Sequence, residues 1–129
     1  MEKLYLETTH NSPKVDFNPE TGVLEISGRA IPEDAHMFFK SLFTWVKEYV
    51  ASDPINTVVE IKLDYLNSSA HKLLMEFFEI LKTLHLSDQK LIVKWFYEKY
   101  DEEIHEIGEE YANSTGIPFE IIEVAEFSV

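Results

Sequence analysis

The sequence predicts an α/β fold of the mixed α+β kind, with one central mixed sheet of about six strands and three helices mainly on one face. Two observations predict it. Near the N-terminus, short runs of alternating apolar and polar residues are separated by turn residues, which is typical of an antiparallel meander. The rest of the chain alternates helix-spaced apolar stripes with β-branched runs, which is typical of strand–helix–strand crossovers. We therefore expect a single domain covering residues 1–129.

The N-terminal part of the chain predicts three strands. Alternating residues at Leu4–Leu6 predict a short first strand, and those at Val15–Phe17 predict a second. A third strand is expected over Val23–Ser27. The preceding segment Pro19–Gly22 has the residues of a tight turn, so the second and third strands should form an antiparallel hairpin.

A first helix and a central strand are expected next. The segment Pro32–Asp34 is typical of a helix start, because proline suits the first turn and acidic residues suit the positive end of the helix dipole. Apolar residues then recur at helical spacing, which predicts a helix from about Pro32 to Ala51. The largely apolar run Thr57–Leu63 predicts a central strand covered on at least one face.

The C-terminal half predicts two more helices and two more strands. A broad apolar stripe predicts a second helix over Ser68–Leu84, which ends near Ser87. A strand is expected at Leu91–Tyr97 and a third helix at Asp101–Asn113. The final segment, Pro118–Ile122, begins with proline and predicts an edge strand.

Gly108 falls inside the predicted third helix, where glycine is less favourable than alanine by about 1 kcal/mol. Close packing against another part of the backbone would explain a glycine there. A tolerated imperfection or a kink would explain it equally well.

Composition limits the kinds of partner and chemistry. The chain has 24 acidic and 11 basic residues, and its formal net charge of −13 would repel nucleic acids and anionic membrane surfaces. The charge serves either solubility or the docking of a basic protein face. The absence of cysteine excludes disulfides, thiol catalysis and a cysteine zinc site. No apolar stretch is long enough to predict a membrane span, so we expect a soluble, cytoplasmic protein.

The segment Leu63–Lys72 combines the end of a strand, a tight turn and the start of a helix. The first backbone N–H groups of a helix have no partner within it and lie at the positive end of its dipole, so a phosphoryl group on a hydroxyl there would be stabilised. Ser68 is the candidate acceptor, with Ser69 as a second candidate. The same residue types also suit an ordinary N-cap, because serine and asparagine oxygens accept from those N–H groups.

Several blocks along the chain resemble one protein family by their order and spacing. They are Gly28-Arg29, Pro32-Glu33-Asp34-Ala35, Phe39, Trp45, Asp64 to Lys72, Trp95-Phe96-Tyr97, Asp101-Glu102-Glu103 and Glu106-Ile107-Gly108-Glu109. Together they resemble the SiaC family of bacterial regulatory phosphoproteins. The resemblance implies a small STAS-like domain, similar in architecture to anti-sigma factor antagonists.

The resemblance also implies a function and its partners. Family members are phosphorylated on a hydroxyl residue by a serine/threonine protein kinase and dephosphorylated by a metal-dependent PPM-type phosphatase. Some unphosphorylated members bind and activate a diguanylate cyclase, which links them to cyclic di-GMP and biofilm control. Carried onto this chain, the resemblance makes Ser68 the acceptor and reaches Asn67 and Ser69 only as its neighbours. We expect the predicted second helix to form part of the partner face, with the partner-binding residues Asn67, Ser68, Ser69, His71 and Lys72. The resemblance implies no cofactor, no bound metal and no catalytic residue.

Two positions depart from the family pattern. Where the family usually has a hydroxyl residue after Gly28-Arg29, this chain has Ala30, and where the family has a further serine after Ser69, it has Ala70. The hydroxyl at the acceptor position is kept as Ser68. Any recognition that uses the two missing hydroxyls is therefore not carried over.

Asp64, Ser68 and His71 have the residue types of a hydrolase triad, and Ser68 and His71 could touch across one helical turn. The glycines that flank a nucleophile elbow are missing, however, and there is no glycine-rich loop for an oxyanion. The sequence therefore disfavours a serine hydrolase.

Asp101, His105 and Glu109 would share one face of the third helix at four-residue steps. They could bind a divalent metal, but a charged outer face is the commoner outcome, because carboxylate sites normally draw ligands from more than one element. The histidines show no paired spacing, which disfavours a zinc site.

Four aromatic residues, Trp45, Trp95, Phe96 and Tyr97, could form an exposed patch for a partner. Each lies in an apolar-periodic segment, so core packing is the favoured interpretation.

We therefore interpret the chain as a non-catalytic switch protein that carries charge on Ser68 when phosphorylated. The alternative is a constitutive protein-interaction or assembly domain without a phosphoswitch, in which Ser68 is only a helix cap.

Overall fold

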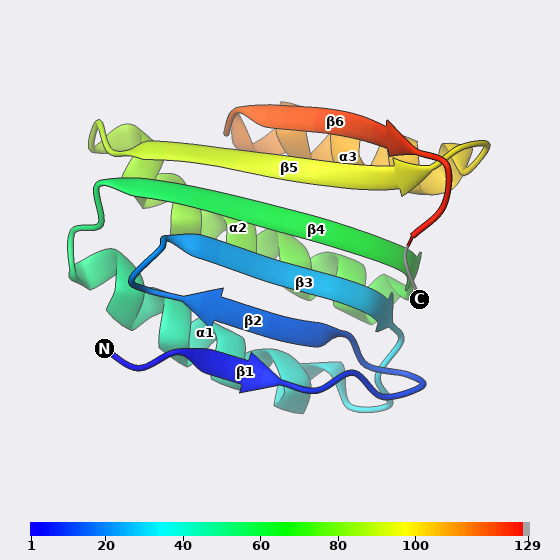
Figure 1. Cartoon of the computed structure of the whole chain (residues 1–129), viewed down its shortest axis with the longest axis horizontal. Helices are drawn as coiled ribbons and strands as arrows, with labels where there is room; N and C mark the ends of the chain where they lie inside the picture. Colours follow the sequence, from blue (N-terminus) through cyan, green and yellow to red (C-terminus); the bar gives the residue numbers. More distant parts are fainter. Residues whose placement is uncertain (128–129) are drawn as a thin grey trace.

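The computed structural model describes residues 1–127 and contains six strands and three helices, in agreement with the predicted fold class. In chain order they are β1 (Leu4–Leu6), β2 (Lys14–Asn18), β3 (Val23–Ala30), α1 (Ala35–Ala51), β4 (Asn56–Leu66), α2 (Ser68–Leu86), β5 (Lys90–Glu98), α3 (Glu102–Thr115) and β6 (Phe119–Val124). The strands form one sheet in the order β1-β2-β3-β4-β5-β6 (Figure 1).

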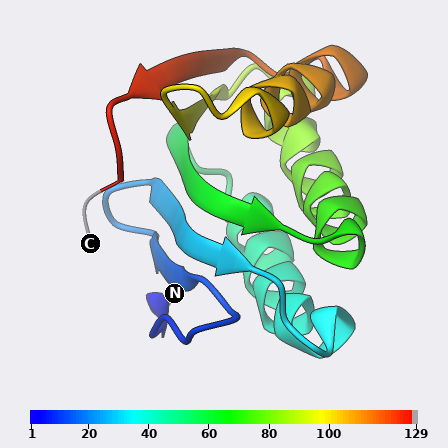
Figure 2. The same cartoon turned by 90° about the vertical axis from the view of Figure 1, so that its right-hand side faces the viewer.

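The sheet has an antiparallel part and a parallel part. β1, β2 and β3 pair antiparallel, whereas β3, β4, β5 and β6 pair parallel. Each helical crossover moves the chain by one strand in the same direction, and crossovers between parallel strands keep one hand. All three helices therefore cover the same face of the sheet (Figure 2), and β6 is an edge strand, as predicted.

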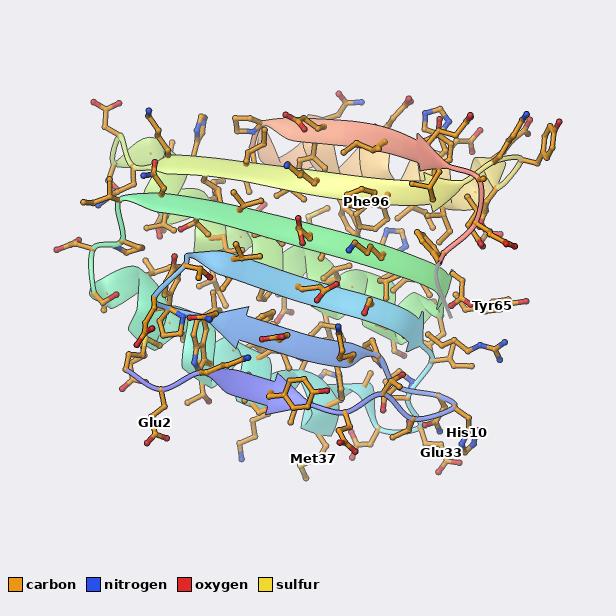
Figure 3. All side chains as sticks on the ribbon, viewed as in Figure 1. Glu2, His10, Glu33, Met37, Tyr65 and Phe96 are labelled. Atoms are coloured by element: carbon orange, nitrogen blue, oxygen red, sulfur yellow. The ribbon has the colours of Figure 1, made fainter. Side chains whose placement is uncertain are left out.

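Alternation along the strands separates an apolar face from a polar one. The buried side chains of the central strands are Leu24, Ile26, Val59, Ile61, Leu63, Leu91, Val93 and Trp95, and they face the helices. Phe17 of β2 stacks on Phe77 of α2, with ring centroids 5.7 Å apart, and packs against Trp45 of α1. Within residues 1–127 no helix covers the opposite face, which we call the open face, and Phe96 lies on it (Figure 3). The core is therefore a single layer between the sheet and the helices.

Several predicted boundaries differ from the structure by a few residues, and two of them lie near the candidate site. α1 begins at Ala35, after Pro32, because the Asp34 carboxylate accepts a hydrogen bond from the Met37 amide (3.0 Å) and caps the helix there. β4 continues to Leu66, beyond its predicted end, because its pairing with β3 extends to the last residue of that strand.

Close packing explains Gly108, but the neighbour is the Trp95 side chain of β5 and not another backbone, so that part of the prediction is wrong. A Cβ at Gly108 would overlap the indole ring of Trp95, so the glycine allows the helix to approach the strand closely. The Trp95 Nε1 also donates to the Ile104 carbonyl of the same helix at 2.9 Å. Trp95 is fully buried and Trp45 nearly so, which confirms the core interpretation for both tryptophans.

Within the described part of the chain, no helix has the length and apolar character needed to cross a membrane.

Candidate functional site

The turn between β4 and α2 is built around Asn67. Its backbone amide donates to the Ala30 carbonyl (3.0 Å), which extends the β3–β4 pairing, and its backbone carbonyl accepts from the His71 amide (2.9 Å). Its side-chain oxygen accepts from the Ala70 amide at 2.9 Å, so Asn67 is the N-cap of α2. The interpretation of Ser68 as the N-cap is therefore wrong, because the preceding residue, Asn67, caps the helix.

Ser68 is the first residue of α2 and is exposed, as is Ser69. Within residues 1–127, neither hydroxyl has a hydrogen-bond partner. The amides at the start of a helix lack intrahelical partners, and Asn67 occupies only that of Ala70 with its side chain. A phosphoryl group on Ser68 would therefore meet N–H groups that have no partner in the described part of the chain, together with the positive end of the helix dipole.

A β-bulge lies just before this turn. Gly28 is opposite Leu63 and Arg29 is opposite Tyr65, so Asp64 is the extra residue on β4. Gly28 has a φ of 121°, a conformation that side chains rarely adopt. The bulge changes the direction of the side chains at the carboxyl ends of β3 and β4.

Three of these residues form what we call the Arg29 cluster: Arg29, Asp64 and Tyr65. The Arg29 guanidinium carbon lies 4.9 Å from the centre of the Tyr65 ring, and its Nε lies 3.8 Å from Asp64 Oδ2. The Asp64 Oδ1 is buried and has no hydrogen-bond partner among the described residues. Half of the Arg29 side chain is exposed, and Tyr65 projects from the carboxyl end of the sheet with 55% of its surface exposed (Figure 3).

His71 links the first turn of α2 to α3. Its carbonyl accepts a hydrogen bond from the Tyr111 hydroxyl (2.8 Å), and its ring packs edge-to-face on the Tyr111 ring. Burial raises the pKa of Tyr111 well above its ordinary value, so the hydroxyl remains a donor. His71 Nε2 also lies 3.9 Å from Glu110. Lys72, by contrast, is exposed. Of the predicted partner-binding residues, Asn67 and His71 therefore hold the turn in place, while Ser68, Ser69 and Lys72 face solvent.

The triad residues have separate contacts. Asp64 faces Arg29, and His71 faces Tyr111 and Glu110. No hydrogen bond joins Asp64, Ser68 and His71 in the part of the chain that the structure describes.

The acidic face of α3 makes local contacts. Asp101 is the N-cap of α3 and accepts from the Ile104 amide at 3.1 Å. His105 stacks on Tyr97, with ring centroids 4.4 Å apart, and its Nε2 lies 2.9 Å from Glu109 Oε1. Among residues 1–127 there is no group of three potential ligands arranged for a metal ion.

Comparison with known proteins identifies the family. Residues 6–124 match the model of the SiaC family regulatory phosphoproteins. The chain belongs to the SiaC family. Its fold is similar to the solved structure of SiaC of Pseudomonas aeruginosa, with a TM-score of 0.88 and 24% sequence identity, covering 96% of this chain and 100% of that one.

Two further relatives of this SiaC-family chain are informative. It is similar to the SiaC in the crystal structure of the P. aeruginosa diguanylate cyclase SiaD in complex with its activator SiaC, with a TM-score of 0.88, 25% identity, and coverage of 94% of this chain and 99% of that one. An uncharacterized protein of P. aeruginosa (strain UCBPP-PA14) is 26% identical over 121 residues, covering 94% of this chain and 96% of that protein.

Sequence reasoning did not single out the Arg29 cluster as part of the site. A usable signal was present, because Arg29 is the only arginine in the chain. The bulge that brings Asp64 and Tyr65 beside it depends on strand register, which the sequence pattern does not reveal.

Proposed function

We propose that this chain is a non-catalytic signalling switch whose state is set by reversible phosphorylation of Ser68. A partner serine/threonine kinase adds the phosphate and a PPM-type phosphatase removes it. The unphosphorylated chain binds and regulates an effector, for which a diguanylate cyclase is the leading candidate. One observation carries the proposal: in a chain of this regulatory family, Ser68 presents an exposed hydroxyl at the start of α2, and this hydroxyl has no hydrogen-bond partner among residues 1–127.

The assignment to Ser68 is supported by the fact that Asn67, and not Ser68, caps α2. Because Asn67 caps the helix, the Ser68 hydroxyl is not required for structure and is available for modification. The kinase would transfer the γ-phosphoryl group of ATP to the Ser68 oxygen, which loses its proton, and ADP would leave. Ser69 is also exposed and is the second candidate acceptor.

Phosphorylation would act through charge. It adds about −1.5 to −2 charge units at neutral pH, and in a binding face that charge must be desolvated or matched by cations. An effector surface complementary to the neutral hydroxyl would therefore lose affinity. The effector assignment is supported by the similarity to SiaC, which occurs in complex with the diguanylate cyclase SiaD as its activator.

The first test is phosphorylation itself. The protein is incubated with ATP and a serine/threonine kinase sought among the neighbouring genes, and the modified site is located by mass spectrometry in the parent, Ser68→Ala and Ser69→Ala proteins. We expect one phosphate on the parent and on Ser69→Ala, and none on Ser68→Ala. A phosphate that remains in Ser68→Ala and disappears in Ser69→Ala would move the acceptor to Ser69.

The second test is binding to a diguanylate cyclase from the same genome. The unphosphorylated parent and Ser68→Ala should bind it, whereas the phosphorylated parent and Ser68→Asp should bind at least tenfold more weakly, a loss of about 1.4 kcal/mol. Equal binding by all four proteins, with no phosphate found in the first test, would favour a constitutive interaction domain.

A further inference from the structure

We propose that Arg29 is the receptor for the phosphate on Ser68 and that phosphorylation transfers its guanidinium from Asp64 and Tyr65 to the phosphate oxygens. This inference rests on the proposed phosphorylation of Ser68 and deepens it. It makes the switch a rearrangement of the Arg29 cluster in addition to a change of charge.

The chemistry of the side chain favours Arg29. A guanidinium presents a planar pair of N–H donors that matches two phosphate oxygens at once, whereas an ammonium acts as a single point charge. Arg29 is the only arginine in the sequence. The one residue suited to bidentate phosphate binding therefore lies near the end of β3, which pairs with the strand that leads to Ser68.

Backbone pairing places Arg29 and Ser68 at the same end of the sheet. The Asn67 amide donates to the Ala30 carbonyl at 3.0 Å, so the residue after Arg29 is bonded to the residue before Ser68. The carboxyl ends of β3 and β4 lie side by side, and α2 starts directly after them (Figures 1 and 2).

The present contacts of Arg29 are weak enough to exchange. Its Nε is 3.8 Å from Asp64 Oδ2, which is an ion pair too long for a hydrogen bond, and half of the Arg29 side chain is exposed. The contact with the Tyr65 ring is also at the surface, where cation–π attraction is modest. A bidentate, charge-assisted bond to a phosphate is stronger than either contact.

The other cations near this end of the sheet are less suitable. The Lys62 ammonium is paired with Glu25 Oε2 at 3.3 Å and lies over the Phe96 ring. Lys72 is exposed on the first turn of α2 and is the alternative receptor, although it offers no bidentate geometry.

The exchange would change the surface that a partner meets. Loss of the guanidinium would uncover the Tyr65 ring, which is already 55% exposed, and would remove the counter-ion of Asp64. Tyrosine and arginine are among the residues that most often dominate binding energy at protein interfaces. A single phosphate would thus remove an Arg–Tyr cation–π pair from the surface next to it.

The test uses protein in which phosphoserine is inserted at position 68 during translation, so that it needs no kinase. The phosphate is titrated by phosphorus NMR in the parent, Arg29→Gln and Lys72→Gln backgrounds. We expect its second pKa to be lower in the parent than in Arg29→Gln by about 0.5 or more, with Lys72→Gln close to the parent. The Arg29 side-chain N–H resonance should also move when the phosphate is present.

Equal pKa values in the parent and Arg29→Gln would overturn the proposal, as would a rise confined to Lys72→Gln, which would make Lys72 the receptor. Urea unfolding of each variant verifies that the fold is retained. If the neighbouring kinase fails to modify Ser68, the proposed function fails, while this titration still reports whether Arg29 can hold a phosphate there.

Discussion

Two places where a helix meets a strand differ sharply in this molecule. Where α3 packs on β5, Trp95 is fully buried and fills the space that Gly108 leaves free. Where β4 leads into α2, Tyr65 and Ser68 are exposed, and Arg29 is held by an ion pair at 3.8 Å and a ring contact. The α3–β5 contact is closely packed, so rearranging it would cost much free energy. The contacts at the β4–α2 turn are weak surface contacts, so their residues can exchange partners.

The difference teaches how a small domain can switch without unfolding. Buried shape complementarity supplies stability, and truncation of a large buried side chain costs several kcal/mol. Exposed polar contacts contribute little to stability, so they can be rearranged by a single charge. A regulatory site is therefore expected on the second kind of surface, and variants at the two places should show the contrast.

The largest expected effect is at Trp95. Trp95→Ala removes a buried indole and its hydrogen bond to Ile104, and we expect it to lower the free energy of unfolding by about 3–5 kcal/mol. Urea denaturation followed by circular dichroism measures this loss. Phe96→Ala is the matched control, because Phe96 is the next residue and lies half-buried on the open face. Equal losses at the two positions would contradict the assignment of the core to the helix side of β5.

Gly108→Ala tests whether the cost of steric overlap with Trp95 exceeds the gain in helix propensity from alanine. Alanine is favoured over glycine in a helix by about 1 kcal/mol. Overpacking a filled core costs about 1–3 kcal/mol, and the added methyl would overlap the Trp95 ring. We therefore expect a net loss of up to about 2 kcal/mol in urea unfolding.

The control for this substitution is the same change in the Trp95→Ala background. There the overlap is gone, so Gly108→Ala should become neutral or stabilising, and the two substitutions should be non-additive. A Gly108→Ala protein more stable than the parent would show that the close approach of α3 is not required.

A smaller loss of stability is expected at the start of α2, where the neighbouring residues Asn67 and Ser68 have different structural roles. Asn67→Ala removes the N-cap bond to Ala70 and should cost about 1 kcal/mol. Ser68→Ala should change stability by no more than about 0.5 kcal/mol, because the exposed hydroxyl has no partner among the described residues. Thermal and urea unfolding of both variants measure the difference. The reverse order of losses would make Ser68 the cap and weaken its proposed availability to a kinase.

The two regions also differ in how far the sequence could predict them. The buried region was predicted well, because apolar periodicity follows directly from the geometry of helices and strands, and Trp95 and Trp45 lay in periodic segments. Gly108 was left with two explanations, because the ring that it accommodates belongs to another element.

The exposed region was predicted less completely. Ser68 was placed correctly at a helix start, but the choice of cap between Asn67 and Ser68 depends on a one-residue difference in where the helix begins. The start of α1 was predicted early for a similar reason, since the cap is Asp34. The Arg29 cluster was missed because the bulge that assembles it is a feature of strand pairing.

The smallest expected effect concerns the open face of β3, the strand that carries Arg29. Glu25 accepts from Lys14 (3.1 Å) and Lys62 (3.3 Å) across the sheet. Burial alone would raise the pKa of Glu25, but the hydrogen bonds from Lys14 and Lys62 outweigh it and hold the pKa below the ordinary value of 4.5. The hydrogen bond to Glu25 likewise raises the pKa of Lys14 above 10.5.

The signs of these shifts give a pH window. A lowered carboxyl pKa contributes stability that is present above pH 4.5 and is lost as the pH falls through the folded-state value. A raised lysine pKa contributes stability that is present below pH 10.5 and is lost as the pH rises through its folded-state value. Because the partners are partly exposed, the neutral-pH contribution should stay below about 1 kcal/mol.

Glu25→Gln should therefore be slightly less stable than the parent at pH 7, and the difference should disappear at an acidic pH below the folded-state pKa of Glu25, where the parent carboxylate is protonated as well. Urea unfolding at the two pH values measures it. Glu60→Gln is the matched control, because Glu60 lies opposite Glu25 on β4 and is in no ion pair within residues 1–127. A difference that persists at that acidic pH would mean that Glu25 acts through packing instead of charge. Glu25 would then contribute to stability through packing, as Trp95 does.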